Sequence, residues 1–234
     1  MIFFHIFVPT TSHNAMKYLS FFILLFIGEL SVSAQHMFSR QFPFFNQLSS
    51  NEIFSIHQDR EGYFWIGTTN GLARYDGYQL NTFRTDYKNQ NLLTDNGITA
   101  INDNDLYVWI GTWKGLNLYN KQTCRITPFS DARLLDKVVD AITVDKDGNV
   151  WVSAGGMIYR CDSTAHIIKE YEVGNIQEGY AISNIYVDQQ KQLWAVGSRG
   201  IFRYEPETDS FFRYPPLGCL LYTSDAADDL TRVD

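Results

Sequence analysis

The feature that most constrains the fold is a tryptophan that returns at nearly equal intervals along the chain. Trp65, Trp109, Trp151 and Trp194 are separated by 44, 42 and 43 residues. The residue types around the first copy, "GYFWIGTTNGLARYDGYQLNTF", return in the same order around the second, "LYVWIGTWKGLNLYNKQTCRITPF". A period of this length indicates a repeat architecture, in which each copy is one supersecondary unit.

Each unit has the pattern of four short strands. It opens on an alternation of apolar and polar residues that ends in an acid, and a period of two indicates a strand with one buried face. A polar turn, the tryptophan strand, a third strand after a Gly-led turn and a fourth apolar patch follow. The opening alternations are 53–59, 98–103, 141–145 and 182–188. Because stacking hides both faces of such sheets, the sequence predicts an all-β fold, a partial β-propeller of about four four-stranded antiparallel blades.

The residues that recur are expected to build the scaffold. The flat indoles suit the wedge between adjacent blades, and Gly71, Gly115 and Gly200 are expected to supply turn geometry that side chains disfavour. The third unit deviates, with Met157 at the glycine position and Cys161 at the tyrosine position.

One acid also recurs at the same place in every unit. A single catalytic acid would not be repeated in this way, so these carboxylates are expected to satisfy backbone groups of the turns. They are Asp59, Asp103, Asp145 and Asp188.

The order D-x-x-G-x-x-W-I-G-T-x-x-G-L-x-x-Y resembles the two-component regulator propeller repeat. The resemblance covers roughly residues 38–218 and is most specific in the first two units. It implies the periplasmic sensor region of a hybrid two-component histidine kinase/response regulator of the Bacteroidetes type. In that family many repeats form two seven-bladed propellers, and a β-domain, a membrane helix, a kinase and a DNA-binding output follow. Because four blades do not close such a ring, the chain is expected to be an N-terminal fragment.

The chain divides into three expected parts. Residues 1–34 are expected to hold a spurious leader and a secretory signal-peptide helix, which begins at Met16 with one Lys and an apolar run and ends on small residues. An uncleaved anchor or a buried strand is the alternative. The propeller region is 38–218, with units at about 50–88, 96–132, 138–174 and 181–216. Residues 219–234 are expected to be an artefactual tail. Export predicts a periplasmic location, with the longer protein anchored in the inner membrane.

Composition and motifs exclude several classes of function. The net charge of −7 argues against nucleic acid, because phosphate binding needs a basic face. The sequence has no G-x-S-x-G, H-E-x-x-H or phosphate-loop motif and no metal-ligand spacing among its three cysteines, so we expect no enzyme activity, metal or cofactor in this chain. His57 is interpreted as a satisfied or surface histidine, and "DKDGN" (145–149) as a hairpin turn rather than a calcium loop.

Recognition is expected where the units differ, in the turns between the second and third strands. These turns read "TTNG" (68–71), "TWKG" (112–115), "AGGM" (154–157) and "GSRG" (197–200). An indole can stack on a sugar, while amides and cations hold hydroxyl and acid groups. Trp113 is the strongest candidate, because an exposed loop tryptophan needs a reason. Polar loop residues without a ligand are the alternative. The candidate ligand-binding residues are Asn70, Trp113, Lys114 and Arg199.

The expected partner is an oligosaccharide or another small periplasmic ligand, with a homodimer in the longer protein. Membrane contact is expected only through the signal segment or a downstream helix. Two other functions stay open: a secreted scaffold for protein interaction, and a polysaccharide lyase or hydrolase propeller. The second would need convergent His, Tyr or carboxylates on one rim, and the four turns contain no His or carboxylate.

Overall fold

The computed structural model describes residues 42–85, 92–173, 182–198 and 200–214. All of its strands lie in one compact unit, residues 43–234. The expected signal segment 1–34 and tail 219–234 fall outside the described residues. In the described ranges no helix is long and apolar enough to cross a bilayer.

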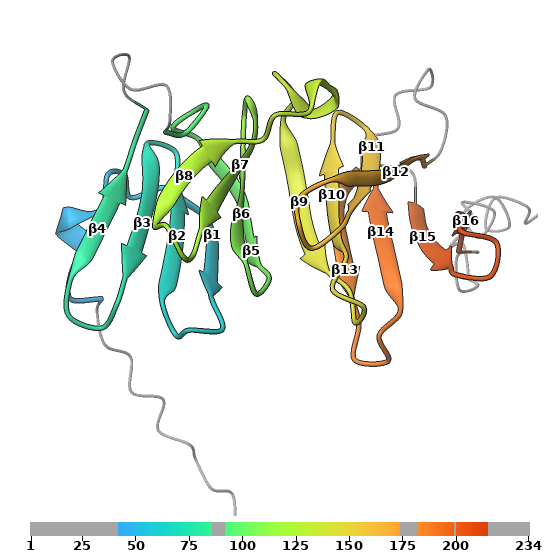
Figure 1. Ribbon diagram of the computed structural model, residues 1–234, viewed down its shortest axis with the longest axis horizontal. Coiled ribbons are helices and arrows are strands. Elements are labelled where there is room, and N and C mark those ends of the chain that lie inside the picture. Colours follow the sequence, from blue (N-terminus) through green and yellow to red (C-terminus); the bar gives the residue numbers. More distant parts are fainter. Residues whose placement is uncertain (1–41, 86–91, 174–181, 199, 215–234) are drawn as a thin grey trace, which may run out of the picture. The chain divides into compact units, whose positions relative to one another are not determined.

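The strands form four antiparallel four-stranded sheets, each running in chain order from first to last strand (Figure 1). The first sheet contains β1 (Ile53–Gln58), β2 (Phe64–Thr68), β3 (Gly71–Tyr75) and β4 (Leu80–Phe83). The second contains β5 (Ile98–Asp103), β6 (Tyr107–Thr112), β7 (Gly115–Asn120) and β8 (Arg125–Pro128). The third contains β9 (Val139–Val144), β10 (Val150–Ala154), β11 (Met157–Cys161) and β12 (Ile167–Glu172). The fourth contains β13 (Ile182–Val187), β14 (Leu193–Gly197), β15 (Gly200–Glu205) and β16 (Ser210–Arg213).

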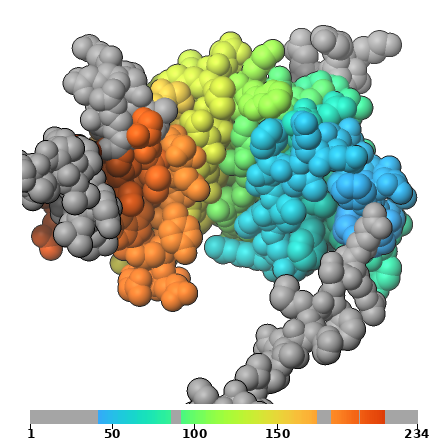
Figure 2. Space-filling view, turned by 180° about the vertical axis from the view of Figure 1, so that it is seen from behind, coloured from blue at the N-terminus to red at the C-terminus, as the bar shows by residue number. Residues whose placement is uncertain are grey.

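Among the described residues, one short 3-10 helix, Phe45–Gln47, precedes β1, and another, Ala132–Leu134, lies between β8 and β9. The predicted all-β partial propeller of four blades is confirmed, and each sheet is called a blade below. The first strands of successive blades pack side by side, β1 on β5, β5 on β9 and β9 on β13. Figure 2 shows the blades in contact in the order of their colours.

The predicted wedge of indoles is confirmed at the three seams between blades. Trp65, Trp109 and Trp151 are at most 1% exposed. The ring of Trp65 meets the edge of Tyr119 in the second blade at 4.8 Å between centroids. The ring of Trp151 meets Tyr204 in the fourth blade in the same way at 4.9 Å. Burying rings of this size supplies much of the energy that holds adjacent sheets together.

The middle seam is built differently, as the irregular third unit predicts. Cys161 pairs with Val150 in β10–β11 as Tyr75 pairs with Phe64 in β2–β3, so the aligned positions are equivalent. Cys161 therefore shares an apolar cluster with Trp109, where the other seams have a tyrosine. Burial raises the pKa of its thiol to about 12, which keeps it protonated and unreactive.

Glycine provides turn geometry where the chain reverses after the tryptophan strand. Gly71 has φ +135°, and a Cβ there would lie 2.9 Å from the Phe83 carbonyl oxygen. In the third blade Met157 occupies the equivalent place, paired with Ala154. Gly155 and Gly156, at φ +58° and +82°, take the positive φ values instead, which is why a methionine is tolerated.

The first and last blades leave large apolar side chains exposed. On the first strand of the first blade Phe54 and Ile56 are 56% and 63% exposed. On the last blade Tyr186 is 58% exposed and Ile201 46%. Terminal repeats of a stacked array need a cap or a further neighbour to cover such faces.

Candidate ligand-binding site

The threonine of the W-I-G-T run shapes the turn that carries the predicted site residues. In the first blade Thr68 Oγ1 accepts a hydrogen bond from Asn70 N at 3.1 Å and donates one to the Gly71 carbonyl at 2.8 Å. In the second blade Thr112 makes the same two bonds, to Lys114 N at 3.1 Å and to the Gly115 carbonyl at 2.8 Å. A recurring residue therefore positions the variable ones.

Trp113 is held firmly at this edge although 44% of it is exposed. Its backbone N–H donates to the Gly97 carbonyl at 3.1 Å. Its ring packs on the Gly97 backbone so closely that a Cβ there would lie 2.4 Å from a ring atom. The exposed ring of Phe54, from the first blade, meets it edge-on at 6.2 Å between centroids. Two exposed aromatic rings from different blades thus lie side by side.

The other predicted residues differ in whether protein groups already occupy their polar side chains. Lys114 lies in the same turn with its side chain 65% exposed, and its Nζ is 3.9 Å from Asp95 Oδ2. The Asn70 amide is occupied by the protein itself, because it donates to the Ser49 carbonyl at 3.2 Å and accepts from Arg84 at 2.5 Å. Arg199 lies outside the described residues.

Phe54 is absent from the sequence-based candidates. The strand "IFSIHQ" carries three large apolar residues, so Phe54 interrupts the strict alternation. That irregularity was the available signal, but only the packing of one blade on the next brings Phe54 to Trp113.

The opposite edge of the blades holds the recurring acids in their turns. Asp59 Oδ1 accepts from Glu61 N at 3.0 Å and Tyr63 N at 2.9 Å, and its Oδ2 accepts from Trp65 Nε1 at 2.6 Å. Asp145 and Asp188 make the same bond to the indole of their own blade, each at 2.8 Å. The predicted role of these three acids in the turns is confirmed, and it extends to anchoring the indole of the same blade.

The turn of the third blade is the predicted hairpin. Asp145 Oδ1 accepts from Asp147 N and Asn149 N, both at 2.9 Å, and Gly148 has φ +83°. Because its other oxygen accepts from Asn149 Nδ2 and Trp151 Nε1, this carboxylate is already fully used by hydrogen-bond donors. Within the described ranges no three His, Cys, Asp or Glu side chains are grouped to hold a metal.

In the described part of the chain, Asp103 does not satisfy the backbone of its own turn, and its one bond to a turn backbone is to Arg60 N of the first blade. The turn of the second blade closes from Asn104 N to the Tyr107 carbonyl, one residue tighter than the bond from Asp59 N to the Tyr63 carbonyl. Asn104 therefore caps this turn, accepting from Leu106 N at 3.0 Å and Tyr107 N at 2.8 Å.

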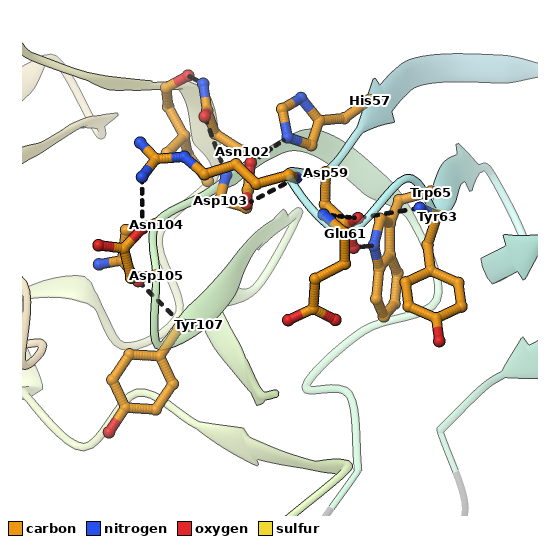
Figure 3. A network of polar contacts seen from close by, with 12 residues as sticks. His57, Asp59, Glu61, Tyr63, Trp65, Asn102, Asp103, Asn104, Asp105 and Tyr107 are labelled. Atoms are coloured by element: carbon orange, nitrogen blue, oxygen red, sulfur yellow. Dashed lines mark hydrogen bonds and ion pairs between the residues drawn. The ribbon is translucent and has the colours of Figure 1, made fainter. Parts of the chain in front are cut away.

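Asp103 is released from the turn to join the first two blades (Figure 3). Its Oδ1 lies 2.7 Å from His57 Nε2, and its Oδ2 accepts from Lys121 Nζ at 2.7 Å and Arg60 N at 3.3 Å. Burial raises the pKa of Asp103, but the bonds from His57 and Lys121 outweigh this effect and hold the pKa at about 2. His57 is thus a satisfied histidine, as interpreted, and it takes part in a contact between blades.

A second carboxylate joins the third and fourth blades. Asp209 accepts from Tyr171 and Tyr204 hydroxyls at 2.6 Å and from Lys169 Nζ at 2.7 Å, and it lies 3.3 Å from Arg160 Nη1. Burial raises the pKa of Asp209, and these donors lower it further than burial raises it. Each of these two seams is therefore bridged by an ionised aspartate of its following blade, Asp103 in the first seam and Asp209 in the third.

Comparison with known proteins places these observations among repeat propellers. A family model described as Two component regulator propeller matches residues 47–70. No curated protein matches the chain.

Several solved structures share the fold. The extracellular domain of a one component system from B. thetaiotaomicron has a TM-score of 0.54 at 21% identity, over 66% of this chain and 21% of that one. The extracellular domain of a hybrid two component system from the same organism has a TM-score of 0.51 at 21% identity, over 74% and 31% of the two chains. Virginiamycin B lyase from Staphylococcus aureus has a TM-score of 0.57 at 18% identity, over 71% and 57%.

These similarities show the shared propeller fold, and the chain spans only 21–57% of the length of these proteins. The residues matched by the family model include Trp65 and the W-I-G-T run of the first blade. The second blade repeats that run at 109–112, and all four sheets have the same strand order. The chain therefore contains a match to the two component regulator propeller repeat in its first blade, within a partial propeller of four blades.

Proposed function

We propose that this chain is part of a periplasmic, ligand-sensing propeller of a two-component signal transduction system, and that the Trp113–Phe54 pair binds a carbohydrate-derived ligand. The observation that carries the proposal is this pair of exposed rings, 44% and 56% accessible, which lie 6.2 Å apart at one edge of the first two blades.

The chemistry of this edge suits a sugar. A half-exposed indole offers an apolar face for sugar C–H groups, and the contact of Trp113 with Gly97 fixes its orientation before a ligand arrives. Lys114 places a largely exposed ammonium in the same turn, where it can donate to hydroxyl or acid oxygens.

The position of the pair also suits signalling. Trp113 comes from the second blade and Phe54 from the first, so one ligand on both rings would join two blades. A ligand changes an equilibrium between two arrangements only by binding one of them better, and a contact across a seam can do so. The sensor systems among the similar structures support this role for the longer protein, as the repeat does.

Binding can be tested with the full chain on a glycan array, followed by calorimetry with the glycans retained. Trp113→Ala and Phe54→Ala are each expected to weaken binding about tenfold or more, because each removes one stacking face. Tyr78→Ala is the matched control, since Tyr78 is an aromatic residue 87% exposed in the β3–β4 turn. The proposal would be contradicted if the array bound no glycan, or if Tyr78→Ala lowered the glycan affinity as much as the other two variants. Binding of a protein instead of a glycan would favour the scaffold function.

The signalling part has its own test. In the source organism, a chromosomal Trp113→Ala replacement is expected to abolish the transcriptional response to the bound glycan. The Tyr78→Ala replacement is expected to leave that response intact. An unchanged response in the Trp113→Ala strain would show that the rim does not carry the signal.

A further inference from the structure

A crevice of about 440 Å³ opens between the third and fourth blades, at the edge opposite to Trp113. One wall is the β9–β10 turn and the other is the β13–β14 turn, with Trp151 and Tyr204 behind them. This volume lies in the range of about 300–1,000 Å³ that is typical of small-molecule sites. The polar lining residues are Asp145, Lys146, Asp147, Asn149, Arg160, Gln190, Lys191 and Gln192.

The equivalent place between the first two blades is bridged. There His57 meets Asp103 at 2.7 Å, and Arg60 pairs with Asp105 across the two turns. These contacts tie the turns of the two blades to each other, where the third and fourth blades leave a crevice.

The register shows why the crevice stays open at the later seam. Thr143 pairs with Trp151 as His57 pairs with Trp65, so a threonine stands where the first seam has its histidine. Val187 pairs with Leu193 as Asp103 pairs with Val108, so a valine replaces the bridging carboxylate. The acid–histidine bridge therefore cannot form here.

Two ammonium groups at the crevice have no hydrogen bond or ion pair among the described residues. They belong to Lys146 and Lys191, which are exposed, one in each wall. In the same part of the structure Asn149 donates its amide N–H to Asp145, and no donor reaches its side-chain oxygen. Arg160 adds a third positive charge behind them, although its Nη1 is shared with Tyr204 and Asp209.

We propose that this crevice is a binding site for an acidic monosaccharide, with its carboxylate between Lys146 and Lys191 and its hydroxyls on Asn149 and Gln190. Two cations that line one crevice from separate turns favour an acid group, because hydrogen bonds between charged groups are the strong ones. The amide side chains supply both donors and acceptors, which hydroxyl groups require. That the ligand is a saccharide rests on the proposed function, while the preference for an acid rests on the crevice itself.

The experiment is calorimetry of the full chain with glucuronate, with glucose and with inorganic sulfate as separate probes. Glucuronate is expected to bind, and glucose is expected to bind at least about tenfold more weakly because it lacks the charge-assisted bonds. Lys146→Gln and Lys191→Gln are each expected to weaken glucuronate binding about tenfold. Arg125→Gln, at an exposed position of β8 in the second blade, is the matched control and is expected to leave glucuronate binding unchanged.

The outcomes separate this site from the aromatic pair. Loss of glucuronate binding with Lys191→Gln but not with Trp113→Ala supports the crevice, whether or not the glycan array finds a ligand for Trp113. Equal affinity for glucuronate and glucose, or no effect of both lysine variants, overturns it. Sulfate binding as tight as glucuronate would also overturn the proposal, because it would show an anion site without sugar recognition. Circular dichroism of each variant verifies that these exposed substitutions leave the fold intact.

Discussion

Asp103 shows how the role of one residue depends on the register of the turn beside it. It stands six positions before its tryptophan, as the other three acids do, yet it binds neither that indole nor its own turn. Instead it is 5% exposed and bonded to His57 of the preceding blade and Lys121 of its own. The indole Nε1 of Trp109 is consequently buried with no partner among the described residues. Deviation at a single position thus converts a turn residue into a bridge between sheets.

Replacing Asp103 with asparagine is expected to lower the free energy of unfolding by about 3–5 kcal/mol, because the charge of Lys121 would stay buried without its partner. The Lys121 side chain is only 6% exposed. Urea unfolding of the variant measures this loss. Asp105→Asn is the control, since that carboxylate is 83% exposed and its pair with Arg60 should contribute about 1 kcal/mol or less. Similar small effects for both variants would show that the bridge does not hold the seam.

The same bridge predicts a dependence on pH. The folded pKa of Asp103 is about 2, below the usual 3.8, so its contribution is complete above pH 3.8 and is lost as the pH falls toward 2. The shift corresponds to about 2 kcal/mol. The difference in unfolding free energy between the wild type and Asp103→Asn should therefore shrink as the pH falls through this window. A difference that stays constant down to pH 2 would contradict the assignment.

At the scale of the element, the seams follow two designs. In the first and third seams an arginine opposite the tryptophan donates to a tyrosine hydroxyl of the next blade, Arg74 to Tyr119 and Arg160 to Tyr204. In the middle seam Leu118 replaces the arginine opposite Trp109, and Cys161 replaces the tyrosine. The middle seam therefore lacks the arginine–tyrosine pair, and Thr99, Asn102 and Asn104 donate across it to backbone carbonyls instead.

These designs predict different responses to the same substitution. Trp151→Phe removes the bond from the indole to Asp145, whereas Trp109→Phe removes an N–H group that has no partner in the described structure. Trp151→Phe is therefore expected to destabilise the chain by about 1–3 kcal/mol more than Trp109→Phe in denaturant unfolding. Equal losses would mean that the bond to the turn carboxylate contributes nothing.

The periodicity of the sequence predicted the strands, but it did not predict the contacts that one blade makes with the next. The tryptophan spacing and period-two alternation are local signals, so they predicted the four sheets and the deviant Met157 and Cys161. The shift from Asp103 to Asn104 left no such signal, because both residues can cap a turn. The internal bonds of the Asn70 amide, the contact of Phe54 with Trp113 and the crevice beside Lys191 all depend on distant segments of the chain.

At the scale of the whole molecule, the four blades bury an indole at each seam between them and leave apolar side chains exposed on the first and last blades. Ile56 on the first blade and Tyr186 on the last are 63% and 58% exposed. The stability of a stacked array is approximately a sum over blades and seams. The first and last blades each have only one seam among the described residues, so they are expected to be the least stable parts.

Unfolding is consequently expected to be gradual. Hydrogen exchange measured by peptide mass spectrometry should show weaker protection in β1 and in β15–β16 than in β6 and β10. Those two strands carry the buried indoles Trp109 and Trp151 and belong to the inner blades, each of which has a neighbour on both sides. Uniform protection across all four blades, with one cooperative transition, would show that the end blades are stabilised as well as the inner ones.

The central claim is that the recurring indoles hold the blades together, whereas the irregular Trp113 binds the ligand. Trp109 and Trp113 lie four residues apart in one blade, yet they are 0% and 44% exposed. The most direct test is the free energy of unfolding of Trp109→Ala and Trp113→Ala beside the wild type. Trp109→Ala is expected to lose about 3–5 kcal/mol and Trp113→Ala about 1 kcal/mol or less. Comparable losses for the two variants would contradict the claim.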